Sequence, residues 1–334
     1  MSRAWLAPLG GVYGLAAAVR VALYRKGLFS TIRLEAPVIS VGNLSVGGSG
    51  KTPVVARIAE LLRDAGQPVA ILSRGYRGSF RGDWLLVSDG ETVLASASEA
   101  GDEPVMLARS LPGVVVAVGP RRDEVGRAVL ERFRPRALLL DDGFQHLRLA
   151  RDLDVLCLDV SDLGDRPLPA GRLREFPRAA WRADLVLLSG ADPGQVAACA
   201  QRIGESRCLG LSRAPQGFFG LQGDPRPAPL RPFLVAAIAR PQRFRADLDR
   251  LVPSLAGQAF FRDHHPFTME EVQELGTRAR SLGADALVIT AKDAVRFPAP
   301  ASELPVLVLR IEARIEPEER FREQLLAVIL RSAA

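Results

Sequence analysis

Short apolar runs alternate with longer amphipathic segments along most of the chain after residue 36. The runs are rich in Val, Ile and Leu and have no polar position to mark a solvent-facing side, which is typical of parallel strands buried on both faces. Before residue 190 they lie at 38–41, 69–72, 114–118, 137–140, 155–158 and 185–188. The pattern predicts an α/β fold, a mostly parallel sheet with helices on both faces.

The segment between the first two runs has the period of a helix. Apolar residues recur from Val54 to Ala65 at the spacing of one helical face, and Gly66 ends the pattern. An amphipathic helix is therefore predicted between the two strands.

A proline-rich stretch at 223–232, GDPRPAPLRP, separates two parts of the pattern. Because proline stiffens the backbone, we interpret this stretch as a linker. Apolar runs at 233–238, 286–289 and 306–309 and a last helix at 318–330 follow it. The predicted units are an N-terminal helix (1–28), a first domain (29–222), the linker (223–232) and a smaller C-terminal α/β domain (233–334).

The amino terminus is apolar and uncharged from residue 4 to residue 19, with Arg3 and Arg20 at its borders. This stretch is shorter than the roughly 20 residues that span a bilayer, so a helix lying in the membrane interface is predicted. Trp5 and Tyr13 suit interfacial depth, and the flanking arginines suit anionic headgroups. A secretory signal and an ordinary buried helix are the alternatives.

Composition narrows the classes of partner. Hydrophobic residues make up 48% of the chain and charged residues 25%, which fits a globular protein. The net charge of +6 comes from 41 Arg and 3 Lys against 38 acidic residues, and guanidinium groups pair well with phosphates and carboxylates. Nucleic acid is not the expected partner, because the arginines are scattered and no recognition motif is present. Three cysteines without C-x-x-C spacing indicate a reducing compartment.

The segment SVGGSGKT at 45–52 follows the first predicted strand and precedes the predicted helix. In that setting glycines let backbone amides converge on phosphate oxygens, Lys51 reaches the β and γ phosphates, and Thr52 offers its hydroxyl to Mg²⁺. The motif G-x-x-x-x-G-K-[ST] begins with Gly, whereas this segment begins with Ser45. We predict a P-loop NTPase-like fold that binds ATP with Mg²⁺, rather than a merely flexible turn. The predicted nucleotide-binding residues are Ser45, Val46, Gly47, Gly48, Ser49, Gly50, Lys51 and Thr52.

The apolar run at 137–140 leads directly into Asp141 and Asp142. Carboxylates at the end of a neighbouring buried strand are what a nucleotide-bound Mg²⁺ requires. The predicted metal ligands are Thr52, Asp141 and Asp142, with one carboxylate on the metal and the other orienting water, substrate or Lys51. An ordinary Asp-Gly turn after a strand is the alternative.

Several segments together resemble the tetraacyldisaccharide 4'-kinase, or lipid A 4'-kinase, family. VGNLSVGGSGKTP at 41–53 and DDGFQH at 141–146 carry the resemblance, and further matching segments follow in order: SRGY (73–76), GDEP (101–104), LPAG (168–171), LRE (173–175), DHH (263–265) and KDAV (292–295). The resemblance implies ATP- and Mg²⁺-dependent phosphorylation of the 4' hydroxyl of a tetraacylated glucosamine disaccharide 1-phosphate, giving lipid IVA. It implies the cytoplasmic face of the bacterial inner membrane as the location, with this lipid and the membrane surface as partners. No protein partner is inferred.

The resemblance also implies a catalytic pair, Asp102 in GDEP and His264 in DHH. A carboxylate that accepts the proton of a sugar hydroxyl, steadied by an imidazole, suits phosphoryl transfer. The residues alone leave open a helix cap for Asp102, a metal site at the histidines and a structural role for His265. A pairing of Asp102 with His264 would place the site between the two domains.

Further residues are predicted contacts of the acceptor or of phosphates, and the arginines among them suit phosphate because guanidinium groups bind it in a bidentate way. They are Arg74, Tyr76, Arg122, Gln145, His146, Arg174 and Glu175. Lys292 with Asp293 is either a further ligand-binding pair or a local ion pair. The chain departs from the family pattern at 237–241, where a glycine-rich turn is commoner, and at Arg172, where a second Pro is usual.

Two other functions start from the same loop. A nucleotide-driven switch is one, because a P-loop alone specifies binding and not an acceptor. Its GTP form would carry an N-K-x-D segment, which this sequence lacks. A kinase of a soluble small molecule is the other, in which the apolar terminus would only be part of a core.

Overall fold

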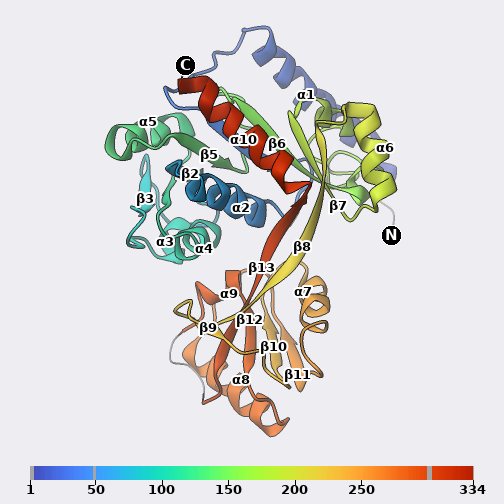
Figure 1. The fold of residues 1–334 in the computed structure, drawn as a ribbon. Coiled ribbons are helices and arrows are strands. Elements are labelled where there is room, and N and C mark those ends of the chain that lie inside the picture. The colour runs from blue at the N-terminus through green and yellow to red at the C-terminus, as the bar shows by residue number, and fades with distance from the viewer. Residues whose placement is uncertain (1–3, 48–49, 299–302, 334) are drawn as a thin grey trace.

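The computed structural model describes residues 4–47, 50–298 and 303–333. Two lobes are joined by two long neighbouring strands, β8 (Cys208–Phe219) and β13 (Val306–Glu316), as Figure 1 shows. One sheet runs through both lobes in the order β11-β10-β12-β13-β8-β7-β6-β1-β5-β2-β4-β3, and β9 pairs with β8. The predicted α/β class is confirmed.

The first lobe is built on a parallel sheet with one antiparallel edge strand, β3. All six runs predicted before residue 190 are strands, because continuous apolar residues bury both faces of the backbone. The strands are β1 (Val38–Asn43), β2 (Val69–Ser73), β3 (Leu85–Ser88), β4 (Val115–Val118), β5 (Ala137–Asp141), β6 (Leu153–Asp159) and β7 (Leu185–Ser189). The sequence did not predict β3.

Helices cover both faces of this sheet. The predicted amphipathic helix is α2 (Lys51–Asp64), which packs with α4 (Asp102–Ser110) and the last helix, α10 (Glu318–Ala333), in one core cluster. Residues of α5 (Arg122–Phe133) pack in a second cluster formed by alternate residues of the same strands. The remaining elements of this lobe are α3 (Ala97–Ala100), α6 (Pro193–Ile203) and the short 3₁₀ turns η2 (Val160–Asp162) and η3 (Pro177–Arg182).

The second lobe is smaller and also has helices on both faces of a parallel sheet. The predicted runs at 233–238 and 286–289 are its strands β10 and β12, and the run at 306–309 is the first part of β13. The new elements are β9 (Pro225–Arg226), β10 (Phe233–Ala236), β11 (Gly257–Phe260), β12 (Leu287–Thr290), α7 (Pro241–Leu248), α8 (Met269–Ser281) and α9 (Ala291–Ala294). Two apolar clusters lie on its opposite faces.

The chain passes between the lobes along an antiparallel ribbon of β8 and β13. The proline-rich stretch at 223–232 follows this ribbon, and its Pro225–Arg226 segment pairs with the end of β8 inside the second lobe. The chain then returns along β13, and Glu318 of α10 forms an ion pair of 2.7 Å with Arg57 of α2. The ribbon, rather than residues 223–232, therefore spans the lobes, and α10 packs on the first lobe.

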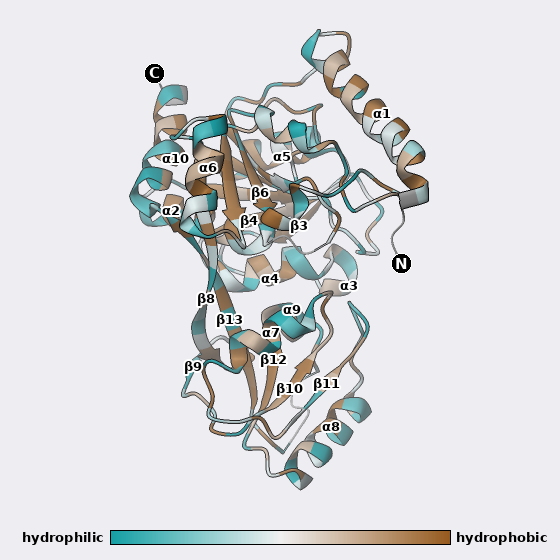
Figure 2. Ribbon diagram, turned by 90° about the vertical axis from the view of Figure 1, so that its right-hand side faces the viewer, coloured by the Kyte–Doolittle hydropathy of each residue, from teal (hydrophilic) through white to brown (hydrophobic). Residues whose placement is uncertain are grey.

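The apolar amino terminus forms a short 3₁₀ turn, η1 (Ala4–Leu6), and a long helix, α1 (Ala7–Arg25), on the outside of the first lobe (Figure 2). A Cβ at Gly14 would lie 2.6 Å from the ring of Phe176, so glycine permits the close packing there. Most of the helix is exposed, and so is Trp5 in the preceding turn η1 (78%). By length and hydropathy α1 could cross a membrane. Only 11% of its most apolar 18-residue segment is buried, which disagrees with an ordinary core helix.

Candidate active site

A cavity of about 1550 Å³ lies between the two lobes. The loop before α2, the end of β5 and the start of α4 form its wall in the first lobe. Residues of α7, α9 and the β8–β13 ribbon form the opposite wall, and α1 contributes Tyr13 and Arg20 at one side. The carboxyl ends of the central strands thus face the cavity, which is where open α/β sheets bind ligands.

The glycine-rich loop lies between β1 and α2, in the predicted strand–loop–helix order. Gly47 (φ 112°) and Gly50 (φ 80°) adopt backbone conformations that other residues rarely adopt, and Gly50 directly precedes the first residue of α2. Val46, Gly47, Gly50, Lys51 and Thr52 line the cavity, while Gly48 and Ser49 lie outside the described residues. The amino terminus of α2 and its unpaired backbone amides therefore point into the cavity, as phosphate binding requires.

Lys51 is held at the base of the cavity by two side chains. Its Nζ donates to Asn43 Oδ1 at 2.9 Å and lies 3.4 Å from Asp142 Oδ1. Asn43 also donates to the Ser45 carbonyl at 2.6 Å, so it connects the lysine with the beginning of the loop. Asn43 was not predicted from the sequence. A polar residue at the carboxyl end of a fully buried strand was the available signal.

Asp141 and Asp142 are adjacent but have opposite pKa shifts. Burial raises the pKa of Asp141 to about 7, the nearby charge of Glu103 adds to this, and Lys51 opposes it. Burial also acts to raise the pKa of Asp142, but Lys51 and Arg174 outweigh it, so the pKa of Asp142 is lowered. Asp142 is thus a fixed negative charge between two cations.

The predicted residues Gln145, Arg174 and Glu175 form one connected group beside Asp142. Arg174 Nη1 lies 3.0 Å from both Asp142 carboxylate oxygens and donates to Gln145 Oε1 at 3.3 Å. Gln145 Nε2 donates to Glu175 Oε1 at 3.1 Å, and Arg182 binds the same carboxylate at 2.6 and 2.7 Å. Arg182 was missed, because nothing in the local sequence distinguishes it from the many other arginines.

Asp102 and His264 meet across the two lobes. His264 Nδ1 lies 2.5 Å from Asp102 Oδ2, and Arg296 Nε lies 3.0 Å from Asp102 Oδ1. Asp102 is the first residue of α4, but its side chain makes no capping bond, and Gly101 occupies the cap position. The helix-cap interpretation is therefore wrong.

Lys292 completes this inter-lobe cluster. Its Nζ lies 3.1 Å from His264 Nε2, 3.4 Å from Asp263 Oδ1 and 3.9 Å from Glu103 Oε1. An ammonium group only donates hydrogen bonds, so His264 Nε2 accepts and the proton on Nδ1 points to Asp102. Asp293 instead binds the Thr290 hydroxyl at 2.7 Å, so Lys292 and Asp293 do not form a local ion pair.

His265 has surroundings unlike those of its neighbour. Its Nε2 lies 3.0 Å from Glu271 Oε1, and its ring stacks on Phe261 at 4.7 Å between centroids. Within the described part of the chain, no group of three or more His, Cys, Asp or Glu side chains is arranged to hold a metal ion. The contacts of His265 favour a structural role.

The other tentative contacts divide into two groups. Arg74 and Tyr76 are exposed and line the cavity. Arg122 is buried, and its pKa is lowered by burial and by the charge of Arg74. The pKa of His146 is lowered to about 4, mainly by burial and also by the charge of Arg122. Neither Arg122 nor His146 is among the described residues that line the cavity.

Comparison with known proteins gives consistent matches along the whole chain. The family model described as tetraacyldisaccharide-1-P 4'-kinase matches residues 2–330. The chain is 44% identical over 314 residues to the tetraacyldisaccharide 4'-kinase of Geobacter metallireducens, covering 91% of each chain. It is 44% identical over 322 residues to that of Anaeromyxobacter dehalogenans strain 2CP-C, covering 90% of this chain and 83% of the relative.

A solved structure agrees with these sequence matches. The crystal structure of an "apo" form of LpxK from Aquifex aeolicus in complex with ATP superposes with a TM-score of 0.81 and 32% sequence identity. The match covers 98% of this chain and 99% of that one, so both lobes and α1 are included.

Proposed function

Because the chain belongs to the tetraacyldisaccharide-1-P 4'-kinase family, we propose that it transfers the γ-phosphate of ATP to the 4' hydroxyl of a tetraacylated glucosamine disaccharide 1-phosphate, giving lipid IVA. The observation that carries this proposal is that His264, which lines the same cavity as the glycine-rich loop, contacts the carboxylate of Asp102. One element binds phosphates, and the other can activate a hydroxyl.

ATP is bound by the loop and by the amino terminus of α2. The backbone amides at the start of α2 donate to the phosphates, and the Lys51 ammonium neutralises the β and γ oxygens. Asn43 and Asp142 hold that ammonium in place before the nucleotide arrives. The relative with bound ATP supports this assignment.

The residues beside the loop also fit Mg²⁺. Mg²⁺ prefers oxygen ligands, and Thr52 and Asp141 bring a hydroxyl and a carboxylate to one end of the cavity. The buried Asp141 carboxylate accepts a bond from Ser73 at 3.2 Å and has no cation paired with it among the described residues. Mg²⁺ would neutralise charge on the β and γ oxygens of ATP. Asp142, paired with Lys51 and Arg174, orients these cations.

Asp102 acts on the acceptor. Its carboxylate accepts the proton of the 4' hydroxyl as the hydroxyl oxygen bonds to the γ phosphorus, the bond to the β–γ bridging oxygen breaks and ADP leaves. His264 and Arg296 hold the two carboxylate oxygens and so fix the direction of the acceptor. His264 donates from Nδ1, so it stabilises Asp102 as an anion until the proton is transferred.

The acyl chains of the acceptor require an apolar environment, and α1 provides one beside the cavity. Tyr13, Ala17 and Val21 of α1 line the cavity, and Arg20 Nη1 donates to the Gln145 carbonyl at 3.2 Å. With the outward face of α1 in the membrane interface, the sugar headgroup would reach the cavity while the acyl chains stay in lipid.

We place the protein at the cytoplasmic face of the bacterial inner membrane, where ATP is available. Arg74, Tyr76, Gln145, Arg174 and Glu175 are the proposed headgroup contacts on the cavity wall, with Arg122 and His146 beside them.

The test is an acceptor panel with the full-length protein, Mg²⁺ and ATP labelled at the γ position. Tetraacyldisaccharide 1-phosphate in mixed micelles is compared with free glucosamine 1-phosphate and with water as acceptors. We expect label in the lipid fraction only. Label in the soluble sugar in preference to the lipid, or release as inorganic phosphate alone, would contradict the proposal.

A further inference from the structure

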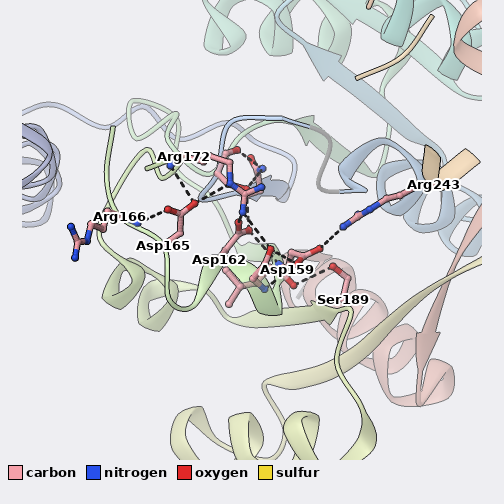
Figure 3. A network of polar contacts seen from close by, with 11 residues as sticks. Asp159, Asp162, Asp165, Arg166, Arg172, Ser189 and Arg243 are labelled. Carbon is pink, nitrogen blue, oxygen red and sulfur yellow. Dashed lines mark hydrogen bonds and ion pairs between the residues drawn. The ribbon is translucent and has the colours of Figure 1, made fainter. Parts of the chain in front are cut away.

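Asp162 is a buried carboxylate outside the catalytic group. It ends the 3₁₀ turn η2, directly after β6, and is 1% exposed. Its Oδ2 accepts a hydrogen bond from the Ser45 hydroxyl at 3.0 Å, and its Oδ1 pairs with Arg172 Nη2 at 3.3 Å. Figure 3 shows this carboxylate among the surrounding polar side chains.

The Ser45 hydroxyl is therefore directed into the protein and not into the cavity. Ser45 is 3% exposed and is not among the described residues that line the cavity, although its neighbour Val46 is. The usual loop begins with Gly, which cannot make this bond. In this chain the first loop residue thus has a side-chain anchor that glycine would lack.

Arg172 holds the same carboxylate from the other side. Its Nε also donates to Asp165 Oδ2 at 3.0 Å, and its carbonyl accepts from the Val46 amide at 2.8 Å. The segment around 172 therefore fixes the loop backbone while its guanidinium balances the Asp162 charge. This explains how the chain uses Arg172, the position where the family pattern has Pro.

The same turn is also held by the second lobe. Asp159, which caps η2, pairs through Oδ2 with Arg243 of α7 at 3.3 Å (Figure 3). Asp159 Oδ1 accepts from the Ser161 hydroxyl at 2.6 Å, which keeps the turn compact. The turn that carries Asp162 is thus held at its first end by Arg243 and at its second end by Arg172, independently of the bond to Ser45.

We propose that Asp162 is a positioning residue: it fixes the first residue of the phosphate-binding loop through the Ser45 hydroxyl, with Arg172 as its counter-ion. The loop amides must point at phosphate oxygens before ATP binds, and an anchored loop does not have to be ordered by the nucleotide. The proposal rests on the nucleotide-binding part of the proposed function and is independent of which acceptor is used.

A double-mutant cycle tests this inference. Asp162→Ala, Ser45→Ala and the double variant are compared for the Kd of a non-hydrolysable ATP analogue with Mg²⁺ and for KM and kcat with the lipid acceptor. We expect each single variant to raise Kd and KM for ATP by about tenfold with kcat within about threefold, and the double variant to be no worse than the poorer single variant. Ser45→Thr, which keeps a hydroxyl, is expected to bind the analogue nearly as well as the unaltered protein.

Asp152→Ala is the matched control for a purely structural carboxylate. Asp152 accepts the Val38 amide at 2.8 Å at the opposite end of β1 and pairs with Arg33 at 2.7 Å, far from the loop along that strand. It should lower Tm without changing the affinity for the analogue. If Asp162→Ala does not fold, the analogue affinity of Ser45→Ala tests the inference by itself. This variant removes the hydrogen bond between Ser45 and Asp162 and leaves Asp162 paired with Arg172.

Three results would overturn the inference. The first is that both single variants bind the analogue within about twofold of the unaltered protein. The second is that the losses of affinity add up in the double variant. The third is a lowered Tm with unchanged affinity in Asp162→Ala, the pattern expected of Asp152→Ala. Because binding of the ATP analogue needs no acceptor, the Kd comparison tests the role of Asp162 even if the protein does not phosphorylate the lipid.

Discussion

The two walls of the cavity are built in different ways. The wall that we propose binds phosphate comes from the ends of neighbouring strands and the start of α2 in one lobe, and Lys51 contacts both Asn43 and Asp142 there. The wall that we propose activates the acceptor exists only where the lobes meet, because Asp102 belongs to the first lobe and His264 to the second. Nucleotide binding should therefore survive changes that abolish transfer, and the two activities should be separable by mutation.

The largest expected effect comes from removing one functional group on each wall. Asp102→Ala should lower kcat by about a thousandfold, the range that a general base contributes, with Kd for ATP within a few fold. Lys51→Ala should instead raise Kd for ATP by at least about tenfold, since it removes a charge-assisted contact to phosphate. Calorimetric ATP binding and steady-state kinetics of both variants measure this. Equal loss of ATP affinity in both would show that the walls do not act separately.

His264→Ala sharpens the comparison, and its neighbour serves as control. Loss of the imidazole that holds Asp102 should lower kcat by about a hundredfold without changing ATP affinity. His265→Ala should retain kcat within about threefold, because His265 contacts Glu271 and Phe261 rather than the catalytic pair. If the two variants lose the same activity, the assignment to His264 fails.

A smaller effect is expected at Lys292. Its ammonium fixes the His264 tautomer, so Lys292→Ala should lower kcat by about tenfold. Lys292→Arg keeps the charge and a donor and should recover part of the activity. Nitrogen-15 chemical shifts of the His264 ring test the cause directly, and an unchanged Nδ1-protonated tautomer in the Ala variant would argue against it.

The smallest effect on nucleotide chemistry is expected from α1. Deletion of residues 1–24 should weaken binding to anionic vesicles by at least about fivefold, since it removes apolar contact area and basic residues together. Kd for ATP should change less than about twofold, because α1 borders the cavity only at its side. Vesicle co-sedimentation and calorimetry measure the two, and equal vesicle binding by the truncated protein would reject a membrane role for α1.

The same contrast explains what the sequence could predict. Strands β1, β2 and β4 to β7 were predicted because they are buried on both faces, and α2 because one face is buried. The long strand β8 was missed, since CLGLSRAPQGFF contains Pro and two Gly and mixes buried, half-buried and exposed positions without a regular period. β-strand propensity predicts a strand buried in a core better than a strand that runs between two lobes.

The site follows the same division. The loop and the carboxylates at 141 and 142 could be predicted because each is contiguous with a recognisable strand or helix. Asp102 and His264 came only from the resemblance, since no local pattern indicates that residues 162 positions apart will touch. Asp162, Arg182 and Arg296 were missed for that reason: their roles are contacts made through space by ordinary polar residues. Asn43 was missed although its position at the end of a buried strand was a usable signal.

The regiochemistry of transfer shows whether the protein is a 4'-kinase with Asp102 as its base. The product formed from tetraacyldisaccharide 1-phosphate, Mg²⁺ and ATP is analysed by phosphorus–proton correlation NMR. We expect the unaltered protein to give one new phosphate coupled to the proton at the 4' position, and the Asp102→Ala protein, with ATP bound, to give this product about a thousandfold more slowly. Coupling to another sugar position, or the same 4' product from Asp102→Ala at an undiminished rate, would contradict this expectation.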